Sequence, residues 1–217
     1  MFTRSEEDHI KAIYGLEQKG PSAFTNDIAE RLNTKASSVT DMLKKLAEKG
    51  VVKHAPYHGA VLTGKGRKHA LMLVRKHRLW ETFLVQRLGF GWDEVHAVAE
   101  QLEHVSSEKL IERLDDYLER PSFDPHGDPI PDSNGKMPQR ETRLLSECAV
   151  GERVRLAAVR DTSDALLQLL DAKGLAIGMT LDVSARAPFD GSLELRSKQG
   201  PTYAISATVA QHLLITT

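Results

Sequence analysis

Residues 93–105, DEVHAVAEQLEHV, constrain the fold of this chain more than any other stretch. Their apolar residues recur at the spacing of an amphipathic helix, which predicts one helix across the whole run. On such a helix, side chains at i, i+4, i+7 and i+8 share one stripe. The residues at these positions are all types that bind metals, namely His96, Glu100, Glu103 and His104. Since the run contains no Lys or Arg, the sequence predicts a patch of imidazole and carboxylate groups on one helix face.

A second pair of ligand-type side chains precedes this run. His77 and Glu81 are four residues apart within residues 65–88, whose apolar pattern predicts a long helix. Imidazole and carboxylate groups together suit a borderline or hard divalent cation. The solvated face of an amphipathic helix explains any one of these residues alone. Six of them, in pairs at ligand spacing, favour a metal site.

A helix-turn-helix pattern lies nearer the N-terminus. Residues 25–33 and 36–49 each have a helical apolar stripe, and a short polar turn separates them. Small hydroxyl side chains at the start of the second helix allow it to enter a DNA major groove and reach base edges. Residues 51–54 and 59–63 predict two short strands, which would form a wing. The candidate DNA contacts are Thr25, Lys35, Ser37, Ser38, Thr40, Lys44 and, in the wing, His58.

The charge distribution supports a DNA-binding N-terminal half. Residues 1–90 carry 16 Lys and Arg against 9 Asp and Glu, whereas residues 91–217 carry 13 against 21. A basic half is typical of a chain that meets a polyanion. A helix-turn-helix also occurs as a protein-packing unit, but the basic balance and the wing favour DNA.

The C-terminal third has a different pattern. Residues 123–139 are rich in Pro and Gly and predict an ordered loop. Residues 151–159 alternate as a strand, residues 163–172 predict a short amphipathic helix, and further short strands follow. The predicted fold is therefore mainly α with β, ending in a small β domain.

Cysteine usage and hydropathy indicate the compartment. The single cysteine, Cys148, excludes an intrachain disulfide and fits a reducing cytoplasm. We expect Cys148 to be a small buried apolar residue. No apolar run has transmembrane length, and the N-terminus does not have the pattern of a signal peptide. We therefore expect a cytoplasmic protein with no membrane partner.

The order of these motifs resembles the DtxR/MntR family of metal-dependent bacterial repressors. The resemblance covers about residues 1–140, through the helix-turn-helix, the wing, RKHRLWETFL, VHAVAEQLEHV and DPHGDPIP. It implies a winged helix-turn-helix DNA-binding domain at residues 1–72 and a helical dimerisation and metal-binding domain at residues 73–140. It implies an SH3-like, FeoA-type small β-barrel at residues 141–217. It also implies a homodimer that binds operator DNA.

The resemblance assigns metal ligands position by position. One site would comprise Asp8, Glu100, Glu103 and His104, with His77 nearby. A neighbouring site would comprise His77, Glu81 and His96. Each subunit would then hold one or two ions.

Two positions indicate which metal is expected. Iron-type members of the family place Met and Cys where this chain has Asp8 and Glu100. Because both positions here carry oxygen donors, the resemblance favours Mn²⁺, with Fe²⁺ as the alternative. Manganese-type members often place a Glu at the position of Lys11, so a paired-ion arrangement of that type is not expected here.

The function that the resemblance implies is a Mn²⁺-activated repressor of metal-uptake genes, with an Fe²⁺-activated repressor as the alternative. From the residues alone, a metal-dependent enzyme and a metal-independent regulator also remain open, because His and Glu clusters on helices build catalytic sites too. The chain has no HExxH motif and no evident nucleophile–base pair, so we do not expect an enzyme.

Overall fold

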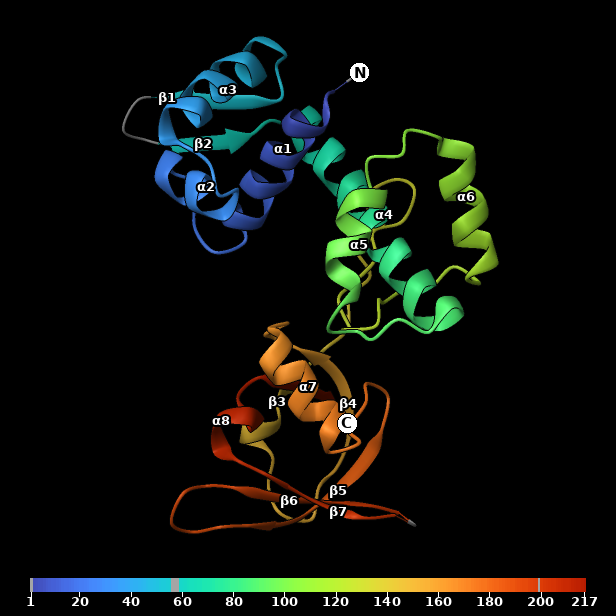
Figure 1. Ribbon diagram of the computed structural model, residues 1–217. Coiled ribbons are helices and arrows are strands. Elements are labelled where there is room, and N and C mark those ends of the chain that lie inside the picture. The colour runs from blue at the N-terminus through green and yellow to red at the C-terminus, as the bar shows by residue number, and fades with distance from the viewer. Residues whose placement is uncertain (1, 56–58, 199) are drawn as a thin grey trace. The chain divides into compact units, whose positions relative to one another are not determined.

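The computed structural model of the 217-residue chain describes residues 2–55, 59–198 and 200–217. The chain divides into two compact units. Figure 1 shows the helices and strands from which they are built. The first unit comprises Met1–His77, Glu100–Glu112 and Pro131–Met137. The second comprises Arg78–Ala99, Arg113–Ile130 and Pro138–Thr217.

The first unit begins with a winged helix-turn-helix, as predicted. Its elements are α1 (Arg4–Glu17), α2 (Thr25–Arg31), α3 (Ala36–Glu48), β1 (Val52–Ala55) and β2 (Gly59–Leu62). The two strands pair antiparallel and form the base of the wing. The wing residue His58, a predicted DNA contact, lies outside the described residues.

Local chemistry fixes the ends of these helices. Thr3 caps α1 in a capping box, because its side chain accepts from the Glu6 backbone N–H and the Glu6 carboxylate accepts from the Thr3 N–H. Asn33, in the turn between α2 and α3, has a φ of 48°, a left-handed conformation that Asn tolerates better than most residues. The buried core of this part includes Ile10, Ile13 and Leu43, among other apolar residues.

The long helix α4 (Gly64–Leu88) follows the wing, close to the predicted bounds. Gly66 lies so close to the wing that a Cβ there would overlap the carbonyl oxygen of Val51. A glycine is therefore required for this approach of the helix to Val51, the residue before β1. The part of α4 as far as His77 belongs to the first unit.

The single helix predicted for residues 93–105 is wrong in its extent. Helix α5 covers only Val95–Leu102, and Glu103 and His104 lie in the turn that follows. The predicted stripe is therefore divided, because Glu103 is buried whereas His96 and Glu100 are exposed. Glu103 pairs with Lys11 on α1, a long-range contact that helical periodicity does not anticipate. Helix α6 spans Glu108–Tyr117.

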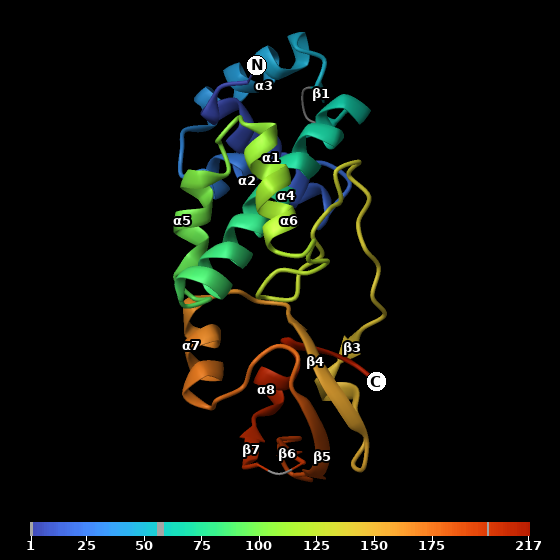
Figure 2. The same cartoon turned by 90° about the vertical axis from the view of Figure 1, so that its right-hand side faces the viewer.

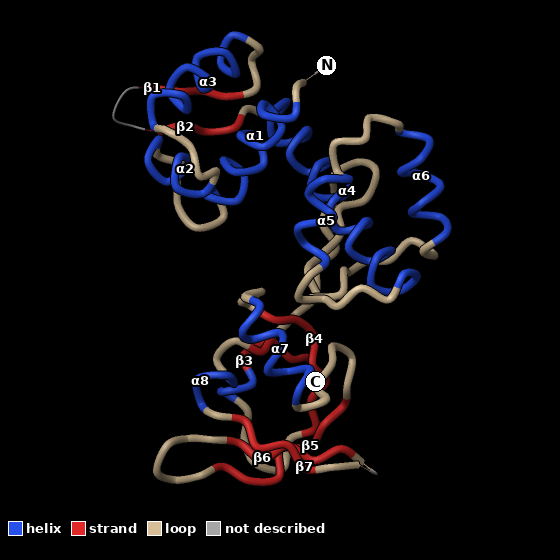
Figure 3. The backbone as a smooth tube through the Cα atoms, in the orientation of Figure 1, coloured by secondary structure: helices blue, strands red, loops and turns tan. Residues whose placement is uncertain are grey.

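The second unit contains a six-stranded antiparallel sheet. Its strands are β3 (Arg143–Leu144), β4 (Arg153–Val159), β5 (Thr180–Arg186), β6 (Leu193–Ser197), β7 (Thr202–Ile205) and β8 (Leu213–Thr216). They pair in the order β3-β8-β4-β5-β6-β7, and Figure 3 shows that all described strands other than β1 and β2 belong to this unit. Register shifts in β4 and β5 mark irregularities of the bulge type, which bend and twist strands.

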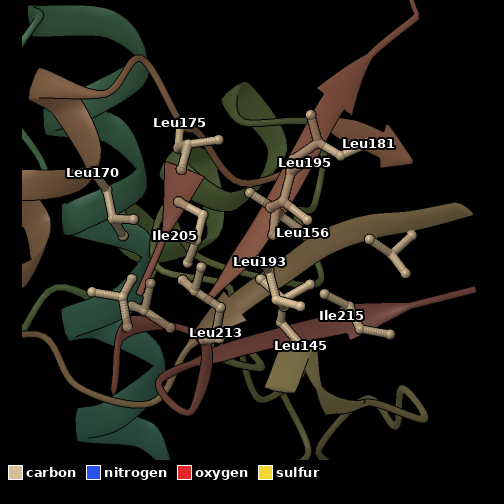
Figure 4. Close-up of a cluster of buried hydrophobic side chains, with 14 of the residues drawn as sticks. Leu145, Leu156, Leu170, Leu175, Leu181, Leu193, Leu195, Ile205, Leu213 and Ile215 are labelled. Atoms are coloured by element: carbon tan, nitrogen blue, oxygen red, sulfur yellow. The ribbon is translucent and has the colours of Figure 1, made fainter. Parts of the chain in front are cut away.

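Three short helical segments accompany the sheet. They are η1 (Leu145–Glu147), α7 (Asp164–Ala172) and α8 (Ala207–Ala210), and α7 was the segment predicted (Figure 2). Leucine and isoleucine side chains from the strands and from α7 form one buried cluster (Figure 4). Cys148 is buried, as expected. Within the described part of the chain, no helix combines the length and apolar character needed to cross a bilayer.

The proline- and glycine-rich stretch of residues 123–139 is an ordered loop, as predicted. Phe123 and Pro129 form an isolated antiparallel bridge. The Arg140 guanidinium lies 3.8 Å from the centroid of the Phe123 ring and donates to the carbonyl oxygen of Ala157 at 2.6 Å. These contacts fasten the loop to β4.

Candidate metal centre and nucleic-acid interface

Three predicted ligands meet where α1 lies against the turn after α5. One donor atom from each of Asp8, Glu103 and His104 lies within 4.8 Å of the other two. His104 Nε2 is 3.1 Å from Asp8 Oδ1 and 3.9 Å from Glu103 Oε1. Two carboxylate groups and one imidazole form a donor set that fits a divalent ion such as Mn²⁺ or Fe²⁺.

Glu7, which the sequence pattern did not single out, orients the imidazole of this cluster. Glu7 Oε2 accepts a hydrogen bond from His104 Nδ1 at 2.7 Å, and Glu7 Oε1 lies 3.3 Å from His69 Nε2. A proton held on Nδ1 leaves the lone pair of His104 on Nε2, the atom that faces Asp8. Burial alone would raise the pKa of Glu7, but its contact with His69 and its hydrogen bond from His104 outweigh it and lower that pKa. The available signal was the position of Glu7 beside Asp8 in the first helix.

Lys11 enters the same cluster from α1. Its Nζ donates to Glu103 Oε2 at 2.6 Å and lies 3.2 Å from His77 Nδ1. His77 Nδ1 is itself 2.5 Å from the same Glu103 oxygen. Burial alone would raise the pKa of Glu103, but the hydrogen bond from His77 and the charge of Lys11 hold that pKa below its ordinary value. Glu103 therefore stays ionised although its side chain is only 2% exposed.

A cavity of about 290 Å³ adjoins these residues, and Asp8, Glu103 and Glu100 line it. Glu100 is on the rim of the cluster, because its side chain is 52% exposed and its Oε1 lies 3.7 Å from Lys11 Nζ. Burial raises the pKa of Asp8, and the negative charges of Glu103 and Glu100 act in the same direction, against the positive charges of His104 and Arg4. Such a carboxyl group gains from a cation placed beside it.

The other three predicted ligands are His77, Glu81 and His96. Glu81 follows His77 by one turn of α4, and both side chains are buried. Within the second unit, His96 Nδ1 lies 3.2 Å from Glu81 Oε1, and the His96 side chain is largely exposed.

Glu81 also has two buried neighbours that the sequence analysis did not assign as ligands. One donor atom each from Glu81, Asp124 and His126 lies within 4.8 Å of the others. His126 Nε2 donates to the carbonyl oxygen of Trp92 at 2.7 Å, which leaves the lone pair on Nδ1. His126 Nδ1 is 3.9 Å from Glu81 Oε2 and 3.9 Å from Asp124 Oδ1. The signal in the sequence was the Asp-Pro-His spacing in a turn, next to the assigned Glu81.

Around the buried carboxyl group of Asp124, negative side chains outweigh positive ones. Burial raises its pKa well above the ordinary value, and the charges of Glu81 and Asp128 act in the same direction. Arg78 opposes them from α4, with its Nε 3.5 Å from Asp124 Oδ2. Two buried carboxylates beside an oriented imidazole fit a divalent cation.

Of the predicted DNA contacts that lie within the described residues, four are exposed and two are half-buried. Lys35, Ser37 and Ser38 are exposed where α3 begins. Lys44 is exposed further along α3 and pairs with Asp41 at 3.2 Å. Two other predicted contacts are less accessible: Thr25 is half-buried at the start of α2, and half-buried Thr40 donates its hydroxyl to the Ala36 carbonyl oxygen.

Comparison with known protein families agrees with this architecture. Residues 1–60 match the model of the iron dependent repressor N-terminal DNA binding domain. Residues 63–132 match the iron dependent repressor metal binding and dimerisation domain, and residues 143–217 match the FeoA domain.

Individual proteins similar to this chain are named as repressors. The diphtheria toxin repressor of Corynebacterium diphtheriae is 30% identical over 87% of this chain and 87% of its own length. The iron-dependent repressor IdeR of Mycobacterium leprae is 39% identical over 58% of this chain, but the match spans only 54% of IdeR, about half its length. A solved manganese-dependent transcriptional repressor in complex with manganese superposes with a TM-score of 0.81 at 37% identity, over 98% of this chain and 99% of the other.

A winged helix-turn-helix whose first helix also carries a candidate metal ligand, Asp8, is typical of metal-dependent DNA-binding regulators. The chain belongs to the DtxR/MntR family of metal-dependent repressors, as its motifs indicated. The predicted fold class, with its C-terminal SH3-like domain, is confirmed. The interpretation as a metal-dependent enzyme has no support, because the family consists of transcriptional repressors. The exact boundaries at residues 72 and 140 stay predictions.

Proposed function

We propose that this protein is a metal-activated, DNA-binding transcriptional repressor. The proposal rests on one observation: helix α1 contacts both the candidate metal cluster and the end of α3. Asp8 of α1 contributes to the metal cluster, and Glu6 of the same helix accepts hydrogen bonds from Lys49 Nζ, at the end of α3, at 2.6 and 2.8 Å. Any ion that fixes α1 therefore acts on the helix that carries the predicted DNA contacts.

The ligands that we propose for the regulatory ion are Asp8, Glu100, Glu103 and His104. A bound divalent ion would add positive charge beside Asp8 and beside the Glu103 oxygen that does not pair with Lys11. The chain supplies their placement, with Asp8 on α1 and the others within or just after α5. Joined ligands hold α1 to this segment, so that a DNA-binding conformation becomes the dominant one.

We propose Mn²⁺ as the activating ion and Fe²⁺ as the alternative. The donor set consists of carboxylate oxygens and one imidazole, a combination that favours hard and borderline ions over soft ones. The only thiol of the chain, that of Cys148, is buried in the second unit and is not part of the cluster. The relatives include both manganese- and iron-dependent repressors.

A second ion per subunit is proposed at Glu81. The set first inferred from the sequence was His77, Glu81 and His96, and the helix spacing of the first two supports it. The buried donors of Asp124 and His126 extend this set, because their ligand atoms converge on Glu81. The orientation of His126 by the Trp92 carbonyl is typical of a metal-binding imidazole.

Operator DNA and a second copy of the chain are the proposed partners. The exposed start of α3, with Lys35, Ser37 and Ser38, has the small polar and basic side chains that a major-groove helix needs. Large apolar side chains remain exposed on the helices of the second unit, among them Leu88 at 56% and Tyr117 at 59%. Burial of these in a homodimer would place two DNA-binding domains on neighbouring half-sites. The proposed targets are metal-uptake genes, whose repression at high metal closes a feedback loop.

The proposal is tested with DNA selected from a random duplex pool in the presence of Mn²⁺. Gel-shift affinity for the selected duplex is then measured with Mn²⁺, with Fe²⁺ under anaerobic conditions, and with EDTA. We expect the ion to tighten DNA binding by about 10-fold or more. Equal affinity in metal and EDTA would contradict metal activation, and a pool that yields no duplex would contradict specific DNA recognition.

A further inference from the structure

The cationic side chain of Lys11 lies within 4 Å of three of the predicted ligands. Its Nζ is 2.6 Å from Glu103 Oε2, 3.2 Å from His77 Nδ1 and 3.7 Å from Glu100 Oε1. Carboxylate and imidazole groups around a small positive centre are the surroundings that a divalent ion would have. The ammonium group thus already stands in one cation position of the cluster.

Glu103 lies between the Lys11 ammonium and the position proposed for the ion, beside Asp8 and His104. Its Oε2 accepts from Lys11, and its Oε1 faces His104 Nε2 at 3.9 Å, beside Asp8. In two-metal sites the ions lie roughly 3.5–4 Å apart, close enough for one carboxylate to serve both. Here one oxygen of Glu103 is committed to an ammonium, and only the other is directed to Asp8 and His104.

The charges around the cavity oppose a second ion in the same cluster. Three cationic and three anionic side chains line it, so the charged lining is balanced before any ion enters. The cationic side chains are those of Arg4, Lys11 and Arg31, and the anionic ones are those of Asp8, Glu100 and Glu103. One divalent ion leaves a surplus that neighbouring ligands and solvent can screen, whereas a pair of ions would double it.

We propose that Lys11 is a built-in cation that restricts this cluster to a single divalent ion. The inference rests on the proposed metal-activated function and specifies how many ions the cluster of Asp8, Glu103 and His104 accepts. It concerns only this cluster, and an ion at Glu81 is independent of it.

The test compares the full-length wild-type protein with Lys11→Glu and with Lys11→Arg, which keeps the charge. Bound manganese per chain is counted after equilibrium dialysis against Mn²⁺, and electron paramagnetic resonance reports whether two Mn²⁺ ions are exchange-coupled. We expect uncoupled Mn²⁺ in the wild type and in Lys11→Arg. We expect one additional ion per chain and a coupled signal in Lys11→Glu, because the new carboxylate can bridge a close pair.

An ion bound at another site contributes equally to the manganese counts of the wild type and the variants, so it does not affect the difference between them. Circular dichroism verifies that each variant is folded. A coupled pair in the wild type, an unchanged count in folded Lys11→Glu, or an added ion in Lys11→Arg would each overturn the role of Lys11. If Lys11→Glu does not fold, the wild-type spectrum alone still decides, because a coupled pair there contradicts the proposal. A wild type that binds no Mn²⁺ or Fe²⁺ would instead contradict the proposed function.

Discussion

At the scale of single residues, the candidate metal cluster is held in place by side chains outside the proposed ligand set. Glu7 and Lys11 flank Asp8 on α1, and each holds one of the proposed ligands in place. Glu7 bonds to His104, and Lys11 bonds to Glu103. Asp8, Glu103 and His104 could be predicted because a family resemblance marks their positions. Glu7 could not, because its role depends on a contact with a residue 97 positions away.

Replacement of Glu7 by Gln should weaken Mn²⁺ binding by roughly 10- to 100-fold. The amide can still form a hydrogen bond, but it does not fix the proton on His104 Nδ1 as a carboxylate does. Isothermal titration calorimetry measures the affinity. Glu30→Gln, at an exposed position on α2, is the matched control and should bind like the wild type. Equal affinities for all three proteins would show that Glu7 does not position the imidazole.

Glu100→Cys should shift the order of metal preference toward Fe²⁺, Co²⁺ or Zn²⁺. A thiolate is a softer donor than a carboxylate, so it stabilises softer ions relative to Mn²⁺. Glu100 lines the cavity but lies on its exposed rim, so this substitution also tests whether the side chain reaches the ion at all. Competition titrations of the four metals give the order. An order identical to that of the wild type would remove Glu100 from the proposed ligand set.

At the scale of elements, α1 joins the metal cluster to the DNA-binding helix. Glu6, whose side chain is fully buried, lies 3.3 Å from Lys45 in the last turn of α3 and accepts from Lys49, the residue that follows this helix. The hydrogen bond from Lys49 is the main cause that lowers the pKa of Glu6 to about 2, although burial opposes it. The carboxylate thus stabilises the contact between the two helices in its charged form.

Glu6→Gln should lower the free energy of unfolding at neutral pH by about 1–3 kcal/mol, the usual loss for a buried charged hydrogen bond. Because the folded-state pKa is lower than the ordinary 4.5, this contribution is present above about pH 4.5 and is lost as the pH falls toward 2. The difference between wild type and variant should therefore shrink over that range. Urea unfolding in EDTA at several pH values measures it, with Glu48→Gln, exposed on α3, as the control. A difference that does not change with pH would mean that the charge of Glu6 is not what holds α3.

The elements that the sequence predicted well are those with strong periodicity. The bounds of α3 and α4 and the two wing strands follow from apolar spacing and from glycines. The helix predicted at 93–105 failed because Glu103 is drawn into a buried pair with Lys11, a tertiary contact that outweighs local pattern. β3 and α8 were missed because two or four residues are too few to establish a period.

At the scale of the whole molecule, the first compact unit contains the winged helix-turn-helix and the second contains the six-stranded sheet. Each unit also contains a candidate cation-binding cluster. Asp8, Glu103 and His104 belong to the first unit, and Glu81, Asp124 and His126 belong to the second. The sequence indicated the first cluster through spacing and resemblance. The second was only partly visible, because Asp124 and His126 lie in a turn where ordinary turn chemistry explains the same residues.

If the ion and the DNA favour the same conformation, each must tighten binding of the other by the same factor. The ion is expected to favour that conformation through α1, since Asp8 and Glu6 lie on one helix and Glu6 holds α3. Mn²⁺ titrations with and without the selected duplex should therefore give an affinity ratio equal to the ratio of DNA affinities with and without Mn²⁺. A scrambled duplex of the same length, which shares the phosphate charge but not the specific site, is the control. Tighter DNA binding in Mn²⁺ without tighter Mn²⁺ binding on the selected duplex would mean that the ion acts outside this equilibrium, for example by aggregating the protein on DNA.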